Sequence, residues 1–237
     1  YLSKYAEKYA LAFLKANEYL KYKDRAILTG NPVRRNFFGS TKSQIRQKLG
    51  FSQDEKIVLC FGGSLGARRL NEIFMGLVKK VSQDNGFTLI ISTGDKYYTG
   101  FMTALREQKI NITPKIIIKN YIDNMSDMLL ACDLAITRSG AMTVSELAAI
   151  KKPSILIPSP NVTADHQTKN AEELEQVGGC EIISEKNLEI NLIYDKINSI
   201  INNEEKITQM QKALAKISIT DSDKRIYHIV KDVLKVT

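Results

Sequence analysis

The sequence predicts an α/β protein built on a Rossmann-like, doubly wound parallel sheet. Six short apolar runs alternate with stretches of helical periodicity, and neither repeats nor a low-complexity linker interrupt them. The informative turns, at residues 62–67, 122, 138–146 and 165–167, follow these runs or open the next helix. Because the carboxyl ends of parallel strands meet at one edge, these turns are expected to form a single ligand crevice.

The elements follow from apolar runs, periodicity and helix signals. The expected strands cover residues 56–61, 87–92, 115–119, 134–137, 154–157 and 180–184. The expected helices cover about residues 40–50, 67–80, 100–108, 124–132, 143–150, 168–178, 189–203, 204–217 and 221–235. Asp123 suits the N-cap of the helix that ends at Cys132. Apolar residues recur at steps of three or four over residues 1–20, which predicts one more helix, and Ile27–Leu28 is not counted as a strand.

The composition excludes several classes of protein. Hydrophobic residues at 43% and charged residues at 25% are ordinary for a soluble globular domain, and no apolar run approaches the roughly 20 residues that span a membrane. The three cysteines include no C-x-x-C pair, which predicts reduced thiols in a cytosolic protein. Only two histidines are present, so a histidine-based metal site is not expected.

The positive charge is concentrated at the start of the chain. Residues 1–50 hold eleven Lys/Arg against three Asp/Glu, which equals the whole net charge of +8. Such a face fits an anionic membrane surface, nucleic acid or a merely solvated flank. Nucleic acid is the weakest of these interpretations, because no helix-turn-helix, RRM or KH signature occurs.

Residues 133–157 read as strand, tight turn, helix and strand. Thr143 and Glu146 fit the spacing of a capping box, and Pro153 ends the helix. A helix that opens directly after a strand points free N–H groups out of the sheet edge, which makes an anion site. Gly140 would let a phosphate approach, Arg138 would add charge, and Glu146 could accept hydrogen bonds from ribose hydroxyls. Each residue also has a purely structural interpretation: Arg138 as a surface cation, Gly140 as part of a turn and Glu146 as the end of a capping box.

A second turn of the same kind follows the first apolar strand. Gly62-Gly63-Ser64-Leu65-Gly66-Ala67 is a glycine-rich strand-to-helix connection of the phosphate-binding type, with Ser64 as its hydroxyl donor. It is neither G-x-G-x-x-G nor a Walker A sequence, so by itself it is a weak signal. His166 is a possible general base on chemistry alone.

Five segments resemble the donor-binding half of the MurG family of N-acetylglucosaminyltransferases. They are G-N-P-V-R at 30–34, G-G-S-x-G-A at 62–67, R-S-G-A-M-T-V-S-E-L-A-A at 138–149, P-x-I-L-I-P at 153–158 and D-H-Q-T-K-N-A at 165–171. The resemblance is good over residues 28–183 and only general outside them. It implies the C-terminal half of a GT-B glycosyltransferase.

The resemblance also implies a division of the chain and a reaction. Residues 1–30 would be the tail of a missing N-terminal acceptor domain and a linker, 31–220 the donor-binding domain, and 221–237 a C-terminal helix. The family moves N-acetylglucosamine from UDP-N-acetylglucosamine to lipid I with inversion, forming lipid II for peptidoglycan at the cytoplasmic face of the bacterial plasma membrane. No metal or other cofactor is expected, since the single D-x-D, Asp221-Ser222-Asp223, reads as the start of the last helix. This chain would bind donor without turnover, because no glycine-rich acceptor loop is found.

Site residues are carried over by position. Arg34 would help hold the donor, Ser64 would contact it, Ile122 would meet uracil through its backbone, Glu146 would hold ribose and Gln167 would hold the sugar. The full set of expected donor-binding residues is Arg34, Ser64, Ile122, Arg138, Gly140, Ala141, Met142, Thr143, Val144, Ser145, Glu146 and Gln167, with Gly63, His166 and Asn170 as further candidates. The family's catalytic machinery lies largely in the other domain, so no catalytic residue is assigned and His166 is expected to grip sugar hydroxyls.

Two other functions remain open at this point. One is another two-domain UDP-sugar enzyme, such as a UDP-N-acetylglucosamine 2-epimerase. The other is a non-catalytic module that binds a nucleotide or an anionic membrane surface through the basic first 50 residues.

Overall fold

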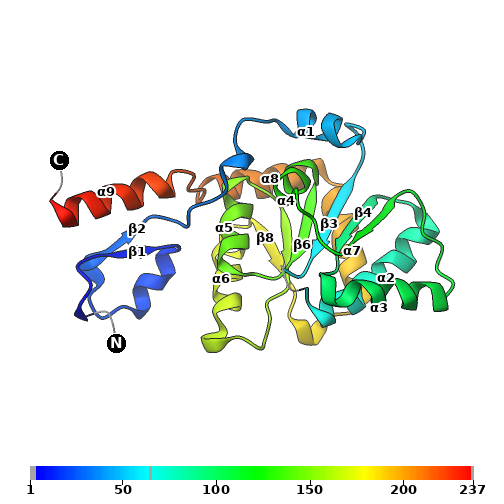
Figure 1. Ribbon diagram of the computed structural model, residues 1–237, viewed down its shortest axis with the longest axis horizontal. Coiled ribbons are helices and arrows are strands. Elements are labelled where there is room, and N and C mark those ends of the chain that lie inside the picture. The colour runs from blue at the N-terminus through cyan, green and yellow to red at the C-terminus, as the bar shows by residue number, and fades with distance from the viewer. Residues whose placement is uncertain (1–3, 64–65, 236–237) are drawn as a thin grey trace.

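The computed structural model describes residues 4–63 and 66–235, and its centre is a six-stranded parallel sheet (Figure 1). The strands are β3 (Ile57–Phe61), β4 (Thr88–Ser92), β5 (Ile116–Lys119), β6 (Leu134–Thr137), β7 (Ser154–Leu156) and β8 (Cys180–Ile182), in the order β5-β4-β3-β6-β7-β8. Each strand lies where the sequence predicts one. The prediction of an α/β, doubly wound sheet is therefore confirmed.

The helices of the described residues are α1 (Lys42–Leu49), α2 (Arg68–Asp84), α3 (Asp95–Glu107), α4 (Met125–Ala131), α5 (Ala141–Ala149), α6 (His166–Glu175), α7 (Ile190–Ile201), α8 (Glu204–Ala215) and α9 (Ser222–Leu234). Helices α2, α3 and α7 pack on one face of the sheet and α4, α5 and α6 on the other. Among the described residues, no helix is long and apolar enough to cross a membrane.

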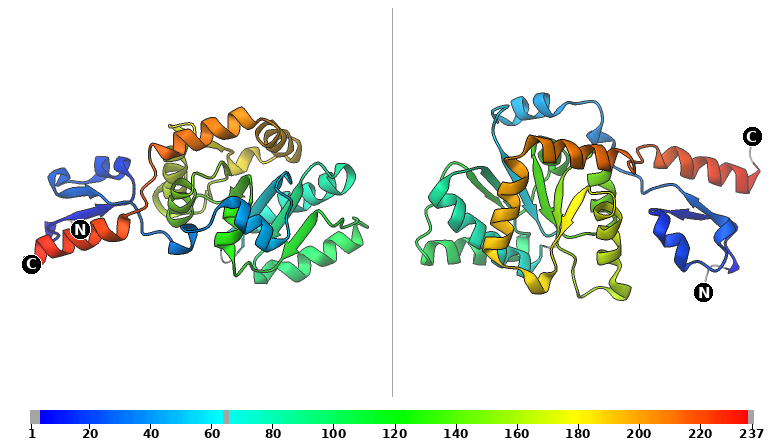
Figure 2. Two further views of the ribbon diagram at one scale, coloured as in Figure 1. Left: turned by 90° about the horizontal axis from the view of Figure 1, so that it is seen from above. Right: turned by 180° about the vertical axis from the view of Figure 1, so that it is seen from behind.

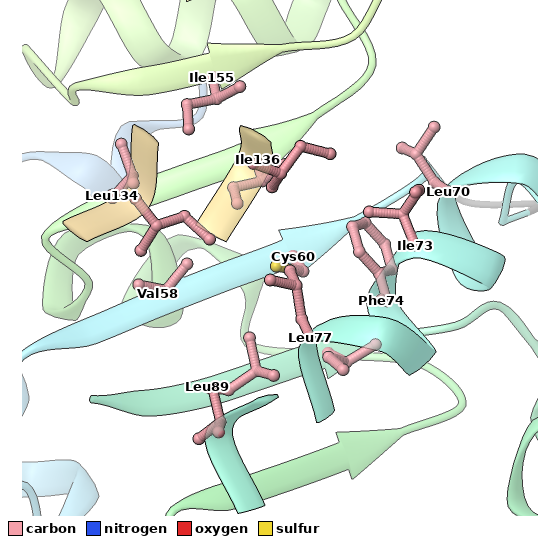
Figure 3. Packing of buried hydrophobic residues seen from close by; sticks show 14 of the residues in the cluster. Val58, Cys60, Leu70, Ile73, Phe74, Leu77, Leu89, Leu134, Ile136 and Ile155 are labelled. Carbon is pink, nitrogen blue, oxygen red and sulfur yellow. The ribbon is translucent and has the colours of Figure 1, made fainter. Parts of the chain in front are cut away.

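Two apolar clusters hold the layers together. Phe74 and Leu77 of α2 pack with Val58 and Cys60 of β3 on one face, in a cluster that also takes in residues of α3 and α7 (Figure 3). The second cluster joins residues of α4, α5 and α6 to the other face of the sheet. The three cysteines are free and buried, and burial raises the pKa of the Cys60 thiol well above its ordinary value.

A small N-terminal unit lies away from the main sheet. Strands β1 (Tyr9–Leu11) and β2 (Ala26–Leu28) pair in parallel, with the short 3-10 helices η2 (Leu14–Tyr19) and η3 (Lys23–Arg25) between them. Helix α9 runs beside this unit in each view (Figures 1 and 2). The Arg225 guanidinium donates a hydrogen bond of 3.3 Å to the Leu28 carbonyl.

The prediction of a helix over residues 1–20 is wrong for the described part, and Ile27–Leu28, which was left out, belongs to a strand. The physical reason is tertiary. Tyrosine and aliphatic residues suit a strand as well as a helix, and a parallel partner 17 residues further along decides between the two.

Two predicted helix caps are also wrong. Helix α5 begins at Ala141 with Gly140 as its N-cap, so Thr143 lies inside the first turn rather than at the start. Helix α4 has Asn124, not Asp123, at its N-cap. Gly140 already has extended backbone angles, and the Glu146 carboxylate is bound by Arg34 instead of closing a capping box.

Candidate functional site

The strand order creates a crevice between β3 and β6. The chain leaves β3 towards β4 and β5, and then returns to build β6, β7 and β8 on the other side of β3. Phe61 and Thr137, the last residues of β3 and β6, are register partners. The turns that follow these two strands therefore start side by side at the carboxyl edge, where open α/β sheets place their ligands.

A cavity of about 500 Å³ opens at this edge. It collects residues from the turn after β3, the first turn of α2, and the turns that follow β6, β7 and β8. Its lining consists of Gly62, Gly66, Ala67, Arg68, Arg69, Glu72, Arg138, Ser159, Asn161, Gln167 and Glu185. Of the predicted donor-binding residues, Arg138 and Gln167 line this cavity.

The turn between β3 and α2 requires glycine at two positions. A Cβ on Gly62 would lie 2.6 Å from the amide nitrogen of Ala67, and one on Gly66 would lie 2.2 Å from the Thr93 carbonyl oxygen. Gly66 also has a φ of +72°, which side chains rarely adopt. Gly63 is exposed in the same turn, and Ser64 lies outside the described residues. Gly62 and Gly66 thus bring main chain, without side chains, against the cavity.

Arg138 is bound by protein groups on several sides. Its Nη1 donates hydrogen bonds of 3.0 Å each to the carbonyls of Ile157 and Pro158, and its Nη2 forms an ion pair with Glu185. Glu185 offsets the positive charge that Arg138 was expected to offer a phosphate. Arg138 therefore ties the loop after β7 to the turn after β8, besides lining the cavity.

The turn after β6 is joined to the start of α6. The Ser139 hydroxyl donates to the Gln167 carbonyl at 2.8 Å, and the Asn170 amide donates to the Ser139 carbonyl at 3.0 Å. The Gln167 side-chain oxygen accepts a hydrogen bond of 2.9 Å from the Ser159 amide. Its side-chain NH₂ is the part that could serve a sugar hydroxyl. Asn170, predicted as a ligand contact, acts in this structure as part of that joint.

The N-terminus of α5 provides the expected amides. Gly140 precedes the helix, and the first helix bond runs from the Val144 amide to the Gly140 carbonyl. Within the described part of the chain no side chain caps this end, while Ala141 and Met142 are exposed. The amides of residues 141–143 thus precede the helical hydrogen-bond ladder, which is the usual anion-binding arrangement.

Other predicted residues take different environments. Val144 is buried and shares an apolar cluster with Ile122, whose side chain is also buried, so Ile122 could meet a ligand only through its backbone. His166 is exposed, and its Nδ1 lies 2.8 Å from the Thr163 carbonyl oxygen. That contact belongs to the loop before α6 and does not suggest a general base.

Arg34 and Glu146 are bound to each other. Arg34 Nε lies 2.7 Å from Glu146 Oε1, and Arg34 Nη2 lies 3.1 Å from Oε2. Next to them, the Asn31 side chain donates a hydrogen bond of 3.1 Å to the Ser145 hydroxyl. These pairs lie where the segment that leaves the N-terminal unit passes α5, and within the described residues none of the four lines the cavity.

The sequence interpretation missed four charged residues of the cavity, Arg68, Arg69, Glu72 and Glu185. Arg68 and Arg69 follow directly after the glycine-rich turn and both pair with Glu72, at 3.3 and 2.8 Å. Hydrogen bonds from Arg69, and then Arg68, keep the pKa of Glu72 below its ordinary value, so this carboxylate is ionised. Their position at the start of a helix after a phosphate-type turn was the available signal. Glu185 follows the last strand at the same edge, so its position offered a signal too.

The chain matches known proteins over most of its length. The model of the "Glycosyltransferase family 28 C-terminal domain" matches residues 57–226. A UDP-N-acetylglucosamine–N-acetylmuramyl-(pentapeptide) pyrophosphoryl-undecaprenol N-acetylglucosamine transferase of Acetivibrio thermocellus is 42% identical over 234 residues. That alignment covers 99% of this chain and 63% of the relative, so the chain spans less than two thirds of the relative's length.

Two solved structures share the fold. The crystal structure of Acinetobacter baumannii MurG superposes with a TM-score of 0.69 at 19% identity, covering 88% of this chain and 58% of the other. The UDP-GlcNAc 2-epimerase of Neisseria meningitidis bound to UDP-GlcNAc gives a TM-score of 0.66 at 14% identity, covering 98% and 62%. At these identities the likeness concerns the fold alone.

Proposed function

The chain belongs to the family defined by the glycosyltransferase family 28 C-terminal domain, in its MurG-like form, and from this premise we propose that it holds the UDP-N-acetylglucosamine donor of a lipid II-forming transferase. The family resemblance drawn from the five segments is thereby confirmed, as is a fold that matches the C-terminal half of GT-B glycosyltransferases. The donor itself, the acceptor lipid I and the complete reaction are the proposal.

The observation that carries the proposal is the convergence at the switch point between β3 and β6. The glycine-rich turn after β3, the uncapped start of α5 and the first turn of α6, which carries Gln167, meet at one edge of the sheet. In the proposal, the amides at residues 141–143 and the turn after β3 receive the diphosphate, and Gln167 holds the hexose. The Ile122 backbone meets the uracil and Glu146 holds the ribose.

The proposed chemistry needs a stabilised leaving group. The acceptor hydroxyl attacks C1 of N-acetylglucosamine from the face opposite the diphosphate and gives its proton to a base outside this chain. The bond from C1 to the β-phosphate oxygen breaks, and UDP leaves with inversion. Negative charge then grows on the β-phosphate. Fixed amide dipoles and the Thr143 hydroxyl suit this task, since preorganised donors need no reorganisation during the reaction.

A titration of UDP and of UDP-N-acetylglucosamine into the chain tests the proposal by calorimetry. Both are expected to bind, with the sugar nucleotide at least as tight because Gln167 adds contacts to the hexose. ADP is the control, and it should bind more weakly because the Ile122 backbone would select a pyrimidine. If neither uridine nucleotide binds to the folded chain, the proposal fails.

The epimerase-like alternative is kept because a UDP-GlcNAc 2-epimerase shares the fold with a TM-score of 0.66. Incubation with labelled UDP-N-acetylglucosamine in the absence of acceptor separates the two. An epimerase would release the 2-epimer, whereas a donor-binding half of a transferase should return the label unchanged.

The proposed location is peripheral, at an anionic membrane surface on the cytoplasmic side. Within the described residues, at least six cations of the first 50 positions form ion pairs with later carboxylates: Lys15, Arg34, Arg35, Lys42, Arg46 and Lys48. The charge left for a membrane is thus smaller than the sequence count suggests. Flotation with vesicles of anionic and of neutral lipid tests this, and equal recovery from both would argue against it.

A further inference from the structure

Glu146 is a buried acid on α5. Its side chain is only 7% exposed, and both of its oxygens receive the guanidinium of Arg34 in the two-pronged arrangement described above. A buried carboxylate without a partner is costly, because it has lost the water that would otherwise solvate it. Arg34 is thus the group that compensates this acid and holds it in place.

Arg34 is itself held from the other side. It occupies the N-cap position of η4 (Arg35–Phe37), and its Cζ lies 5.8 Å from the centre of the buried Phe37 ring. The hydrogen bond from the Asn31 side chain to the Ser145 hydroxyl attaches the same chain segment to α5, at the residue before Glu146. The segment 31–37 therefore positions the Arg34 guanidinium and directs it at Glu146.

Arg34 does not use every lone pair of the Glu146 carboxylate. An ionised carboxylate offers about four lone-pair positions, and Arg34 uses one on each oxygen. Roughly two lone-pair positions remain. The two hydroxyls of a ribose donate one hydrogen bond each, so they would occupy both positions. Arg34 gives its Nε hydrogen and one Nη2 hydrogen to the acid, and among the described residues it does not line the cavity against which the turn after β3 lies.

We propose that Arg34 is a positioning residue that acts on the ribose through Glu146 and does not bind the diphosphate. This inference rests on the proposed function, because it takes Glu146 as the ribose-binding acid. It predicts that Arg34 matters equally for ligands with one or two phosphates. It also predicts that Arg34 matters little once the ribose lacks a hydroxyl.

The conservative variant separates geometry from charge. Lysine keeps the positive charge but has no planar fork, so it cannot satisfy both carboxylate oxygens in this arrangement. R34K is expected to recover only part of the affinity that R34Q loses. A residue that acted merely as a cation near phosphate would be rescued by lysine to a larger extent.

The test measures dissociation constants of UMP, UDP and 2′-deoxy-UDP for the wild-type chain, R34Q, R34K, E146Q and R34Q/E146Q. R34Q should raise the dissociation constants of UMP and UDP by the same factor, about tenfold, which corresponds to the loss of one hydrogen bond to a charged group. The loss for 2′-deoxy-UDP should be clearly smaller. The double variant should bind UDP about as E146Q does, because two residues that act as a unit are not additive.

R35Q is the matched control. Arg35 is the adjacent cation, its side chain is 89% exposed, and it pairs with Asp223 at 3.0 Å, away from Glu146. R35Q should bind all three nucleotides as the wild type does, with melting temperatures recorded for every variant. If R34Q does not fold, R34K and E146Q still compare the three ligands.

The outcomes separate the two proposals. Three results would each overturn the role of Arg34 while leaving the proposed donor site intact. They are a loss of affinity in R34Q that is larger for UDP than for UMP, full recovery of affinity in R34K, and unchanged binding by R34Q. Failure of the wild-type chain to bind UMP and UDP would instead overturn the proposed function, and this inference with it.

Discussion

At the scale of single residues, Gly66 shows how the site constrains the chain. Its φ is +72° and a Cβ would approach the Thr93 carbonyl oxygen to 2.2 Å, so alanine must displace backbone rather than a flexible side chain. We expect Gly66→Ala to lower the free energy of unfolding by about 1–3 kcal/mol, the range for strained backbone positions. Urea denaturation followed by circular dichroism measures this.

Gly100→Ala is the matched control for that change. Gly100 lies inside α3, and nothing stands within 4 Å of the position that its Cβ would take. Alanine there should leave stability equal or raise it by about 0.5–1 kcal/mol, since glycine weakens a helix interior. Equal effects at the two positions would contradict the strain argument for Gly66.

Asp133 makes stability depend on pH. Burial alone would raise its pKa, but the hydrogen bond from Lys42, the Ile57 amide and the charge of Arg46 outweigh it and hold the pKa below its ordinary value. A carboxyl whose folded pKa is depressed contributes stability above its unfolded pKa of about 3.9 and loses it as pH falls through the folded pKa. The wild-type chain should therefore lose stability below about pH 4.

Asp133→Asn tests whether Asp133 causes the loss of stability in acid, through the slope of the urea midpoint against pH. Urea midpoints measured from pH 6 down to pH 2.5 should fall less steeply for the variant, although the variant starts lower because Arg46, only 2% exposed, loses its carboxylate. Parallel slopes for the two proteins would place the acid sensitivity elsewhere.

At the scale of elements, the joint between the turn after β6 and α6 has a measurable role. Asn170→Ala removes the hydrogen bond to the Ser139 carbonyl, and stability should fall by about 0.5–1.5 kcal/mol. Since Gln167 begins the same helix, the variant should lose more affinity for UDP-N-acetylglucosamine than for UDP. Equal losses for both ligands, or none, would separate this joint from the hexose.

The elements also show what the sequence can and cannot predict. The strands of the main sheet were predictable because parallel strands covered on both faces read as unbroken apolar runs, such as Ile57–Phe61. Residues 1–20 were not, since the strand Tyr9–Leu11 exists only through its partner Ala26–Leu28. Local periodicity carries no record of such a pairing.

The same limit applies to charged groups of the site. The positions of Arg138 and Gln167 at the cavity followed from the turns that carry them. Their partners did not, because Arg34 and Glu146 are 112 residues apart in the sequence and Arg138 meets Glu185 from another strand end. The first 50 residues look strongly basic for this reason, since the acids that pair with them come later in the chain.

At the scale of the whole molecule, two parts of very different size share one chain. The six-stranded sheet is covered on both faces, whereas the N-terminal unit has two three-residue strands and lies beside α9 (Figure 2). Exposed apolar side chains occur in this smaller part, at Tyr5, Leu14 and Tyr19, and in the neighbouring α9, at Tyr227 and Leu234. A two-stranded sheet with so little buried surface is marginal on its own.

Hydrogen exchange should therefore divide the molecule. Amides of β3, β4 and β6 are enclosed by neighbouring strands and buried helices, so they should exchange only through global unfolding. Amides of β1 and β2 should exchange at least about 100-fold faster, through local opening that leaves the main sheet intact. Mass spectrometry of peptic peptides from the native chain resolves these segments.

Addition of UDP gives this experiment its internal control. A ligand at the switch point should slow exchange in the turn after β3 and at the start of α5, because those amides gain acceptors there. It should leave β1 and β2 unchanged, since their opening does not involve the main sheet. If β1 and β2 exchange as slowly as β3, the N-terminal unit and the main sheet unfold together. The expectation that the N-terminal unit opens independently of the main sheet would then be wrong.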